Sequence, residues 1–167
     1  VGARTVNHDE SFNSGRYTSA HRFLEPSDRT NDLIALEVRW DLGFAQLTSA
    51  TGVSKFESDG QRDQTDLLMD FDYGYEDFPQ FAAYTRETEE ENSLNQELRL
   101  VSQGTERWNW IAGAFYNKLE VETSSSEFTP GIPDWYGLPP GTPDLEYFAE
   151  SDQTAEEMAL FGELGYN

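Results

Sequence analysis

Apolar and polar residues alternate along much of the chain. In residues 107–122, RWNWIAGAFYNKLEVE, the odd positions from Ile111 to Val121 are mostly apolar, whereas the even positions mix small, aromatic and charged side chains. A period of two is typical of a strand with two different faces. Similar alternation occupies residues 33–42, 94–101 and 158–166. In residues 44–56, Thr, Val and aromatic residues favour a strand, but neither face is decisively apolar. We therefore predict an all-β fold.

The expected strands are joined by connections that alternate in length. Short turns lie near residues 41–43 and 103–106, whereas 57–91 and 122–152 are long and rich in Gly, Pro and acidic residues. Outer-membrane β-barrels have short periplasmic turns and long extracellular loops, and a tilted strand of about nine to eleven residues spans the bilayer. A soluble antiparallel sheet with one buried face has the same alternation.

These features predict a partial outer-membrane barrel. Residues 31–167 would form about five antiparallel strands with long acidic extracellular loops at 57–91 and 122–152. Residues 1–30 would form an irregular loop or a preceding strand.

Composition and charge exclude several classes of protein. The chain has 167 residues and a net charge of −21, and this acidity argues against a nucleic-acid binder. Its aromatic content of 14% argues against simple disorder. The chain has no cysteine, which excludes a disulfide framework, and no apolar run long enough for a transmembrane helix.

Four stretches, in order along the chain, resemble one family. They are DLGFAQLTSATG at 41–52, NQELRLVS at 95–102, WIAGAFY at 110–116 and ALFGEL at 159–164. Each is similar to a barrel strand or hairpin of the TonB-dependent outer-membrane receptors. The resemblance implies a location in the bacterial outer membrane, contact with its lipid, and uptake of a small nutrient such as a siderophore, vitamin or glycan.

The resemblance also implies parts that this sequence does not contain. Family members have a larger barrel, a plug domain and a segment that couples to the TonB complex. About five strands do not close such a barrel, and no plug domain is recognisable here. We therefore expect the chain to be a segment of a larger receptor, with TonB contacts made by the absent parts.

The strand pattern predicts which residues lie on each side of the barrel wall. The residues expected to face lipid are Leu36, Val38, Leu98, Leu100, Ile111, Phe115, Leu119 and Leu160. The residues expected to face the lumen are Glu37, Arg39, Glu97, Arg99, Lys118 and Glu120. The lumen arginines are expected to pair with the glutamates across strands. Trp40, Trp108 and Trp110 lie near the turns, where an aromatic girdle belongs.

Aromatic residues in the second long loop are candidates for ligand contact. These are Trp135, Tyr136, Tyr147 and Phe148. Exposed rings among prolines suit the stacking of a sugar or an aromatic siderophore, and they equally suit packing within the loop.

Acidic residues in the first long loop are candidate ligands of a divalent cation. They are Asp70, Asp72, Glu76 and Asp77. The spacing excludes an EF-hand because Phe81 stands where the last glutamate belongs, but an irregular site stays open. No other cofactor is expected.

The sequence contains no recognisable catalytic motif, so we do not expect an enzyme. Two other functions stay open: a β-sheet structural fragment that self-associates through its edges, and a soluble β-sandwich binding module. The three hypotheses differ in what contacts Leu36, Leu98, Phe115 and Leu160, which would be lipid, other copies or an internal core respectively.

Overall fold

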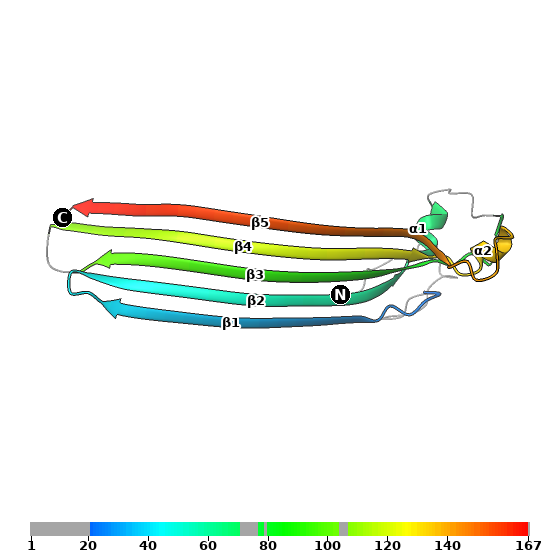
Figure 1. Cartoon of the computed structure of the whole chain (residues 1–167), viewed down its shortest axis with the longest axis horizontal. Helices are drawn as coiled ribbons and strands as arrows, with labels where there is room; N and C mark the ends of the chain where they lie inside the picture. Colours follow the sequence, from blue (N-terminus) through cyan, green and yellow to red (C-terminus); the bar gives the residue numbers. More distant parts are fainter. Residues whose placement is uncertain (1–20, 71–76, 79, 104–106, 167) are drawn as a thin grey trace, which may run out of the picture.

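The computed structural model describes residues 21–70, 77–78, 80–103 and 107–166. Five antiparallel strands form one open sheet, in which each strand pairs with the next along the chain (Figure 1). The strands are β1 (Ser27–Asp41), β2 (Ala45–Asp63), β3 (Tyr84–Ser102), β4 (Trp108–Phe128) and β5 (Leu145–Tyr166). Two short helices follow β2 and β4, namely α1 (Thr65–Asp70) and α2 (Ile132–Trp135). The predicted all-β, antiparallel fold is confirmed.

The two ends of the sheet differ. One end, called the turn end below, contains the connections β1–β2 and β3–β4 and the end of β5. The other, called the loop end, contains both helices (Figure 1). The turn that follows β1 is closed by Gly43, whose φ is +84° and whose amide N–H donates to Asp41 Oδ1 at 2.8 Å. Only glycine adopts such a backbone conformation without strain.

The strands extend further than the sequence pattern predicts. β2 continues to Asp63, β3 begins at Tyr84, β4 continues to Phe128 and β5 begins at Leu145. The irregular connections are therefore shorter than the predicted loops 57–91 and 122–152. Both faces of the sheet are polar in these extensions, so no apolar alternation marks them in the sequence. The backbone ladder nevertheless continues without interruption from β2 to β4.

The pairing register assigns every strand residue to one of two faces, because directly opposed residues have side chains on the same side. One row across all five strands consists of Leu36, Thr51, Gln96, Tyr116 and Met158. The neighbouring row, on the opposite face, consists of Glu37, Ala50, Glu97, Phe115 and Ala159.

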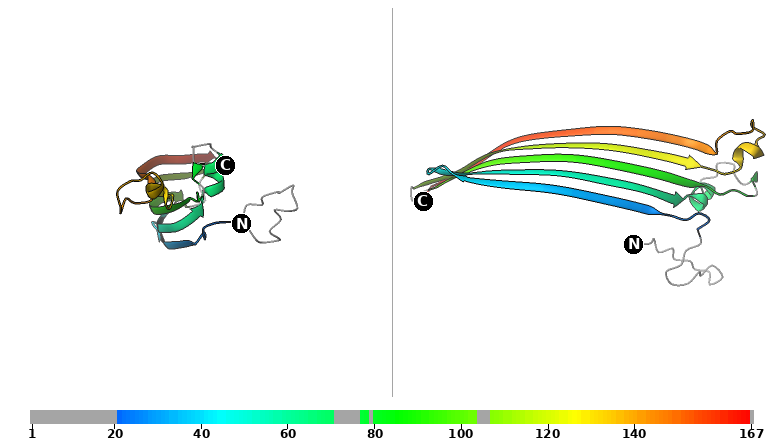
Figure 2. Two further views of the ribbon diagram at one scale, coloured as in Figure 1. Left: turned by 90° about the vertical axis from the view of Figure 1, so that its right-hand side faces the viewer. Right: turned by 60° about the horizontal axis from the view of Figure 1, so that its bottom comes forward.

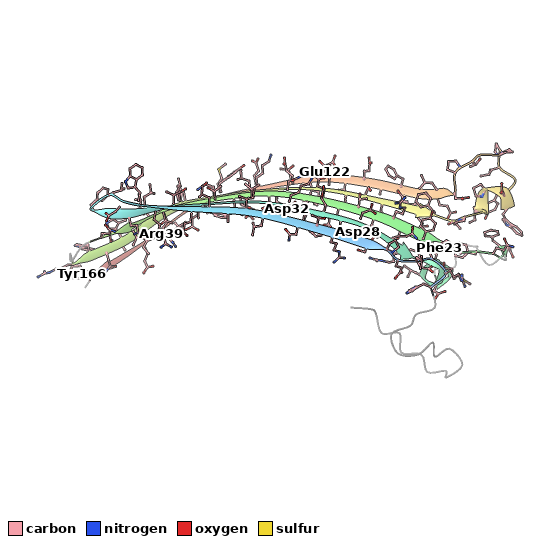
Figure 3. The ribbon with its side chains drawn as sticks, turned by 90° about the horizontal axis from the view of Figure 1, so that it is seen from below. Phe23, Asp28, Asp32, Arg39, Glu122 and Tyr166 are labelled. Carbon is pink, nitrogen blue, oxygen red and sulfur yellow. The ribbon has the colours of Figure 1, made fainter. Side chains whose placement is uncertain are left out.

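The sheet is bowed (Figure 2), and its two faces are exposed to different degrees. On the interior strand β4, the exposed residues between Ile111 and Phe128 are Ala112, Glu120 and Glu122, all on the face of Leu36. Side chains spread apart on a convex surface and converge on a concave one. We call the face that contains Leu36 the convex face and the face that contains Glu37 the concave face. Glu122 and Arg39 illustrate the two sides (Figure 3).

Apart from Ala45 of β2, the buried apolar residues of the described chain gather at the loop end. The largest cluster contains Leu68 of α1, Ile132 of α2, Phe81 and Ala83, with Phe78 packed against it. Among the described residues, β1 and β5 each pair on one side only, so both edges of the sheet are open, and large apolar side chains such as Leu36 and Leu160 are exposed on it.

Candidate functional site

The turn half of the convex face is an uncharged and mostly apolar surface. Three successive rows across the sheet contain no charged residue. The three rows begin at Leu36, Val38 and Trp40 of the edge strand β1. They continue through Leu98 and Leu100 of β3 to Met158 and Leu160 of β5. We call this surface the apolar band. Its large side chains are strongly exposed, with Leu160 at 88% and Met158 at 79%.

Aromatic side chains lie at the border of the apolar band nearest the turn end, which we call its lower border; the border nearest the loop end is its upper border. Trp40 is 66% exposed next to the first turn. Trp108 and Tyr166 are opposed across β4 and β5, and their rings lie 4.8 Å apart at a tilted angle. Tryptophan and tyrosine at such a border suit the boundary between hydrocarbon and water, because each ring has an apolar body and a polar group.

The apolar band runs diagonally across the strands. At its upper border, Ile34, Val53 and Leu94 lie in one row, but this row continues to Lys118 on β4 and Glu156 on β5. The band thus ends lower on β4 and β5 than on the first three strands. Such a stagger is the pattern expected when tilted strands cross a layer of constant thickness.

Above the apolar band, the loop half of the convex face is acidic. Its carboxylates come from all five strands: Asp28, Asp32, Glu57, Asp59, Glu90, Glu120, Glu122, Glu150, Asp152 and Glu156. Seven of these ten carboxylates line a shallow hollow of about 530 Å³, among them Glu57, Glu90 and Glu122.

Lys55 lies within this acidic surface, near its border with the band. Its Nζ atom lies 2.7 Å from Glu57 Oε1 and 3.2 Å from Glu90 Oε1. Hydrogen bonds from Asn92 and Lys55 lower the pKa of Glu90, and the same contacts with Glu57 and Glu90 raise the pKa of Lys55. Both groups therefore stay charged at neutral pH.

The concave face carries charge at the same level as the apolar band. Arg39 contacts Glu37 at 2.6 Å, and Arg99 contacts Glu97 at 3.8 Å. These are pairs along one strand, so the predicted pairing across strands is wrong. The reason is geometric, because β2 separates β1 from β3 and places Ala50 and Thr48 between the two charged pairs.

The register corrects the prediction for β4. Leu36, Val38, Leu98, Leu100 and Leu160 share the convex face, as predicted for the lipid-facing set. The other three members lie on the concave face: Ile111, Phe115 and Leu119.

Two residues predicted to face the lumen are also on the other side. Lys118 and Glu120 lie on the convex face, at and above the upper border of the apolar band. The convex positions of β4 that the sequence pattern missed are Trp110, Ala112, Ala114 and Tyr116. Their sequence signal is weak, since two of the four are small residues.

Glycine lies opposite a larger side chain at three places on the concave face. A methyl group on Gly113 would lie 2.2 Å from Phe161 Cζ, and one on Gly52 would lie 2.5 Å from Asn95 Oδ1. Gly165 has the same relation to Asn109. The larger side chain therefore lies over the glycine, which allows side chains to converge on this face.

At the loop end, the predicted ligand-contact residues do not form a single site. Trp135 packs against Phe78, with ring centroids 5.5 Å apart, so one ring of the set holds the two loops together. Tyr136 is 63% exposed just after α2. Tyr147 lies opposite Glu127 and Phe148 opposite Ser126, so these neighbours are on opposite faces of the sheet.

Asp63 connects three segments at the loop end. Its Oδ1 atom accepts hydrogen bonds from the N–H and the hydroxyl of Thr65, at 2.9 and 2.6 Å, and so caps α1. Its Oδ2 atom accepts from the amide N–H groups of Phe23, at 3.0 Å, and of Arg22. Partial burial raises the pKa of Asp63, but these hydrogen bonds outweigh it, and the net shift is downward.

A second carboxylate at the loop end has the opposite shift. Burial raises the pKa of Glu127, and repulsion from Glu146 raises it further. Glu146 accepts a hydrogen bond from the hydroxyl of Thr129. Nearby, the rings of Tyr84 and Phe128 stack at 5.1 Å across β3 and β4.

The predicted cation site lies mostly outside the described residues. Asp72 and Glu76 fall there, the side chain of Asp70 is not described, and Asp77 is exposed. Across the described part of the chain, no three His, Asp or Glu side chains are arranged to hold a metal ion. Among the described helices, neither is long and apolar enough to cross a membrane.

Comparison with known proteins places the chain in no family. The chain matches no protein-family model, and a search of curated proteins also finds no match.

Proposed function

We propose that this chain forms part of the wall of an outer-membrane β-barrel, in a nutrient receptor of the TonB-dependent kind. One observation supports this proposal most strongly. At the level of the apolar band, the convex face has no charged residue, whereas the concave face has Glu37, Arg39, Glu97 and Arg99. An apolar outer surface around a polar interior is the arrangement of a transmembrane barrel.

The size of the band agrees with this function. Residues 108–116 of β4 and 158–166 of β5 cross it, and a tilted strand needs about nine to eleven residues to span the hydrocarbon. In this arrangement, the turns lie on the periplasmic side. The acidic half and the helices lie outside the cell, where Trp135, Tyr136 and neighbouring aromatic residues would meet a siderophore, vitamin or glycan.

The membrane part of the proposal is tested with single-cysteine variants, since the chain has no cysteine of its own. Leu36→Cys, Leu98→Cys and Leu160→Cys are labelled with bimane in lipid vesicles. The matched controls are the neighbouring concave positions in Glu37→Cys, Glu97→Cys and Ala159→Cys. Brominated lipid should quench the three convex labels strongly and the three concave labels weakly.

The same experiment separates the competing functions. A soluble sandwich would bury the convex labels against protein, and lipid would quench neither set. A self-associated fragment would give the same lack of quenching together with cross-linked copies. Either result would overturn the membrane assignment.

The uptake part needs its own measurement. In a bacterium that expresses the parent protein, deletion of its gene should lower the uptake of one radiolabelled nutrient among a ferric siderophore, a cobalamin and an oligosaccharide. Uptake that is unchanged for all three would exclude the receptor function and leave the membrane assignment standing.

A further inference from the structure

Another hollow lies on the concave face, in the loop half of the sheet. Its volume is about 590 Å³. Two neighbouring concave rows, each across all five strands, supply ten of its lining residues. One row extends from Arg29 on β1 to Ser151 on β5, and the other extends from Ser27 on β1 to Ala149 on β5. With about 4.8 Å between neighbouring strands, each row is roughly 19 Å long.

The two rows offer hydrogen-bonding groups rather than apolar side chains. Arg29, Glu87 and Glu89 supply charges, and within the described part of the chain Arg29 and Glu89 belong to no ion pair. Half of the ten residues carry a hydroxyl group, and all of these are exposed or half-buried: Ser27, Ser58, Thr123, Ser125 and Ser151. The hollow therefore contains donors and acceptors that a polar ligand can reach.

An aromatic residue lies on the same face beyond each of the two rows. Tyr147 belongs to the next concave row toward the loop end, and its residue is 56% exposed. Phe56 belongs to the next concave row toward the turn end, and it is half-buried. An aromatic ring offers an apolar face against which the C–H groups of a sugar ring pack.

These groups distinguish the three nutrient classes of the proposed function. Four glutamates and two arginines line the hollow, in a chain with a net charge of −21, so an anionic ferric chelate would be repelled. Apart from Gly60, Ala149 is the one residue of the two rows that is not polar, so the apolar parts of a cobalamin would have little to contact. The hydroxyls of a sugar both donate and accept, which matches Glu89, Arg29 and the serine hydroxyls together.

We propose that this concave hollow is a binding site for an uncharged oligosaccharide of several sugar units. The ligand lies along the two rows, with its hydroxyls bonded to Arg29 and Glu89 and one sugar ring against Tyr147. The proposal rests on the proposed function, since it narrows three nutrient classes to one. It also places a binding site on the side of the sheet that would face the barrel lumen.

The proposal is tested by binding measurements on the protein in detergent. An array of immobilised neutral hexose and pentose oligosaccharides identifies the ligand that binds most tightly, and titrations with that oligosaccharide, a ferric catecholate chelate and cyanocobalamin give the affinities. The oligosaccharide should bind more tightly than the other two. Arg29→Ala and Glu89→Gln should each weaken its binding by about tenfold, because each removes a hydrogen bond that involves a charged group.

The matched controls are Asp28→Ala and Glu122→Gln, which change exposed convex residues at the same level of the sheet. They should leave the affinity within about twofold of the unmodified protein, as surface substitutions away from a site usually do. Binding to no oligosaccharide of the array, tighter binding of the ferric chelate or of cyanocobalamin, or equal losses in the concave and convex variants would each overturn the proposal.

The lipid-quenching experiment separates this failure from that of the proposed function. Quenched convex labels without oligosaccharide binding reject only the concave binding site. Unquenched labels reject the membrane assignment.

Discussion

The two halves of the convex face share the same five hydrogen-bonded strands, but they carry opposite chemistry. Between the turns and the row of Leu36, the surface is apolar and exposed. From the row of Asp32 to the loop end, it is dominated by carboxylates. The backbone is therefore not what distinguishes the halves. In the proposed membrane arrangement, one continuous sheet would meet two different surroundings, and the border between them would lie within the strands.

A charge placed in each half is the strongest test of this contrast. Leu160→Arg and Asp152→Arg change exposed convex residues of the same strand. In lipid vesicles, Leu160→Arg should lower the free energy of unfolding by about 2–4 kcal/mol, because arginine on the lipid face is costly near the midplane. Asp152→Arg should change it by less than about 0.5 kcal/mol, as surface substitutions usually do. Urea unfolding measures both, and equal costs would remove the distinction between the halves.

The concave side of the turn half provides a second test, which concerns packing rather than charge. Gly113→Ala brings a methyl group against the ring of Phe161, so we expect a loss of about 1–3 kcal/mol from overpacking. In the Phe161→Ala background the same substitution should cost much less, since the ring is gone. The free energy of unfolding is measured for the unmodified protein, Gly113→Ala, Phe161→Ala and the double variant. The difference between the two costs of Gly113→Ala is the coupling energy of the two residues. If Gly113→Ala costs the same with and without the ring of Phe161, the ring does not lie over Gly113.

The loop half depends on hydrogen bonds, and its largest single contribution should come from Asp63. Asp63→Asn weakens the cap of α1 and the contact with Phe23, and we expect a loss of about 1 kcal/mol. Because the pKa of Asp63 is lowered in the folded protein, its charge stabilises fully above the ordinary value of 3.8. That stability is lost as the pH falls through the lowered pKa.

Hydrogen exchange of the Phe23 and Thr65 amides measures this effect locally. Faster exchange is expected in Asp63→Asn at neutral pH, and in the unmodified protein only at acidic pH. Asp59→Asn, on an exposed convex position of the same strand, is the matched control and should leave these amides unchanged. Unchanged amides in Asp63→Asn would show that another contact holds the three segments together.

The sequence pattern predicted the fold better than it predicted the faces. Alternation, together with strand propensity in residues 44–56, located five antiparallel strands, and Gly43 marked the first turn correctly. The face of β4 was inverted because Ile111, Phe115 and Leu119 are more apolar than Ala112 and Ala114. Apolar content within one strand does not determine its face when the opposite face is lined with small residues. The pairing of Leu100 with Ala112 determines it, and a shift of one residue would reverse every assignment.

The loop half was predicted least well, for a different physical reason. Residues such as Ser124, Ser125 and Ser126 belong to a strand with two polar faces, which has no apolar periodicity. The hydrogen bonds of Asp63 join residues that are distant in sequence, and no local pattern indicates them. The packing of Phe78 against Trp135, which joins the two loops, also links residues that are distant in sequence, so no local pattern indicates it.

The ladder continues well above the apolar band, and this has a consequence for reach. At about 3.3 Å per residue, the part of β2 from Val53 to Asp63 is roughly 33 Å long. In the proposed membrane arrangement, this part of the sheet would hold α1, α2 and Trp135 at a distance from the bilayer surface. A solute that first contacts Trp135 would then have to move along the sheet, over a distance greater than its own length, before it reached Arg39 and Arg99. Capture and entry would be separate events in space.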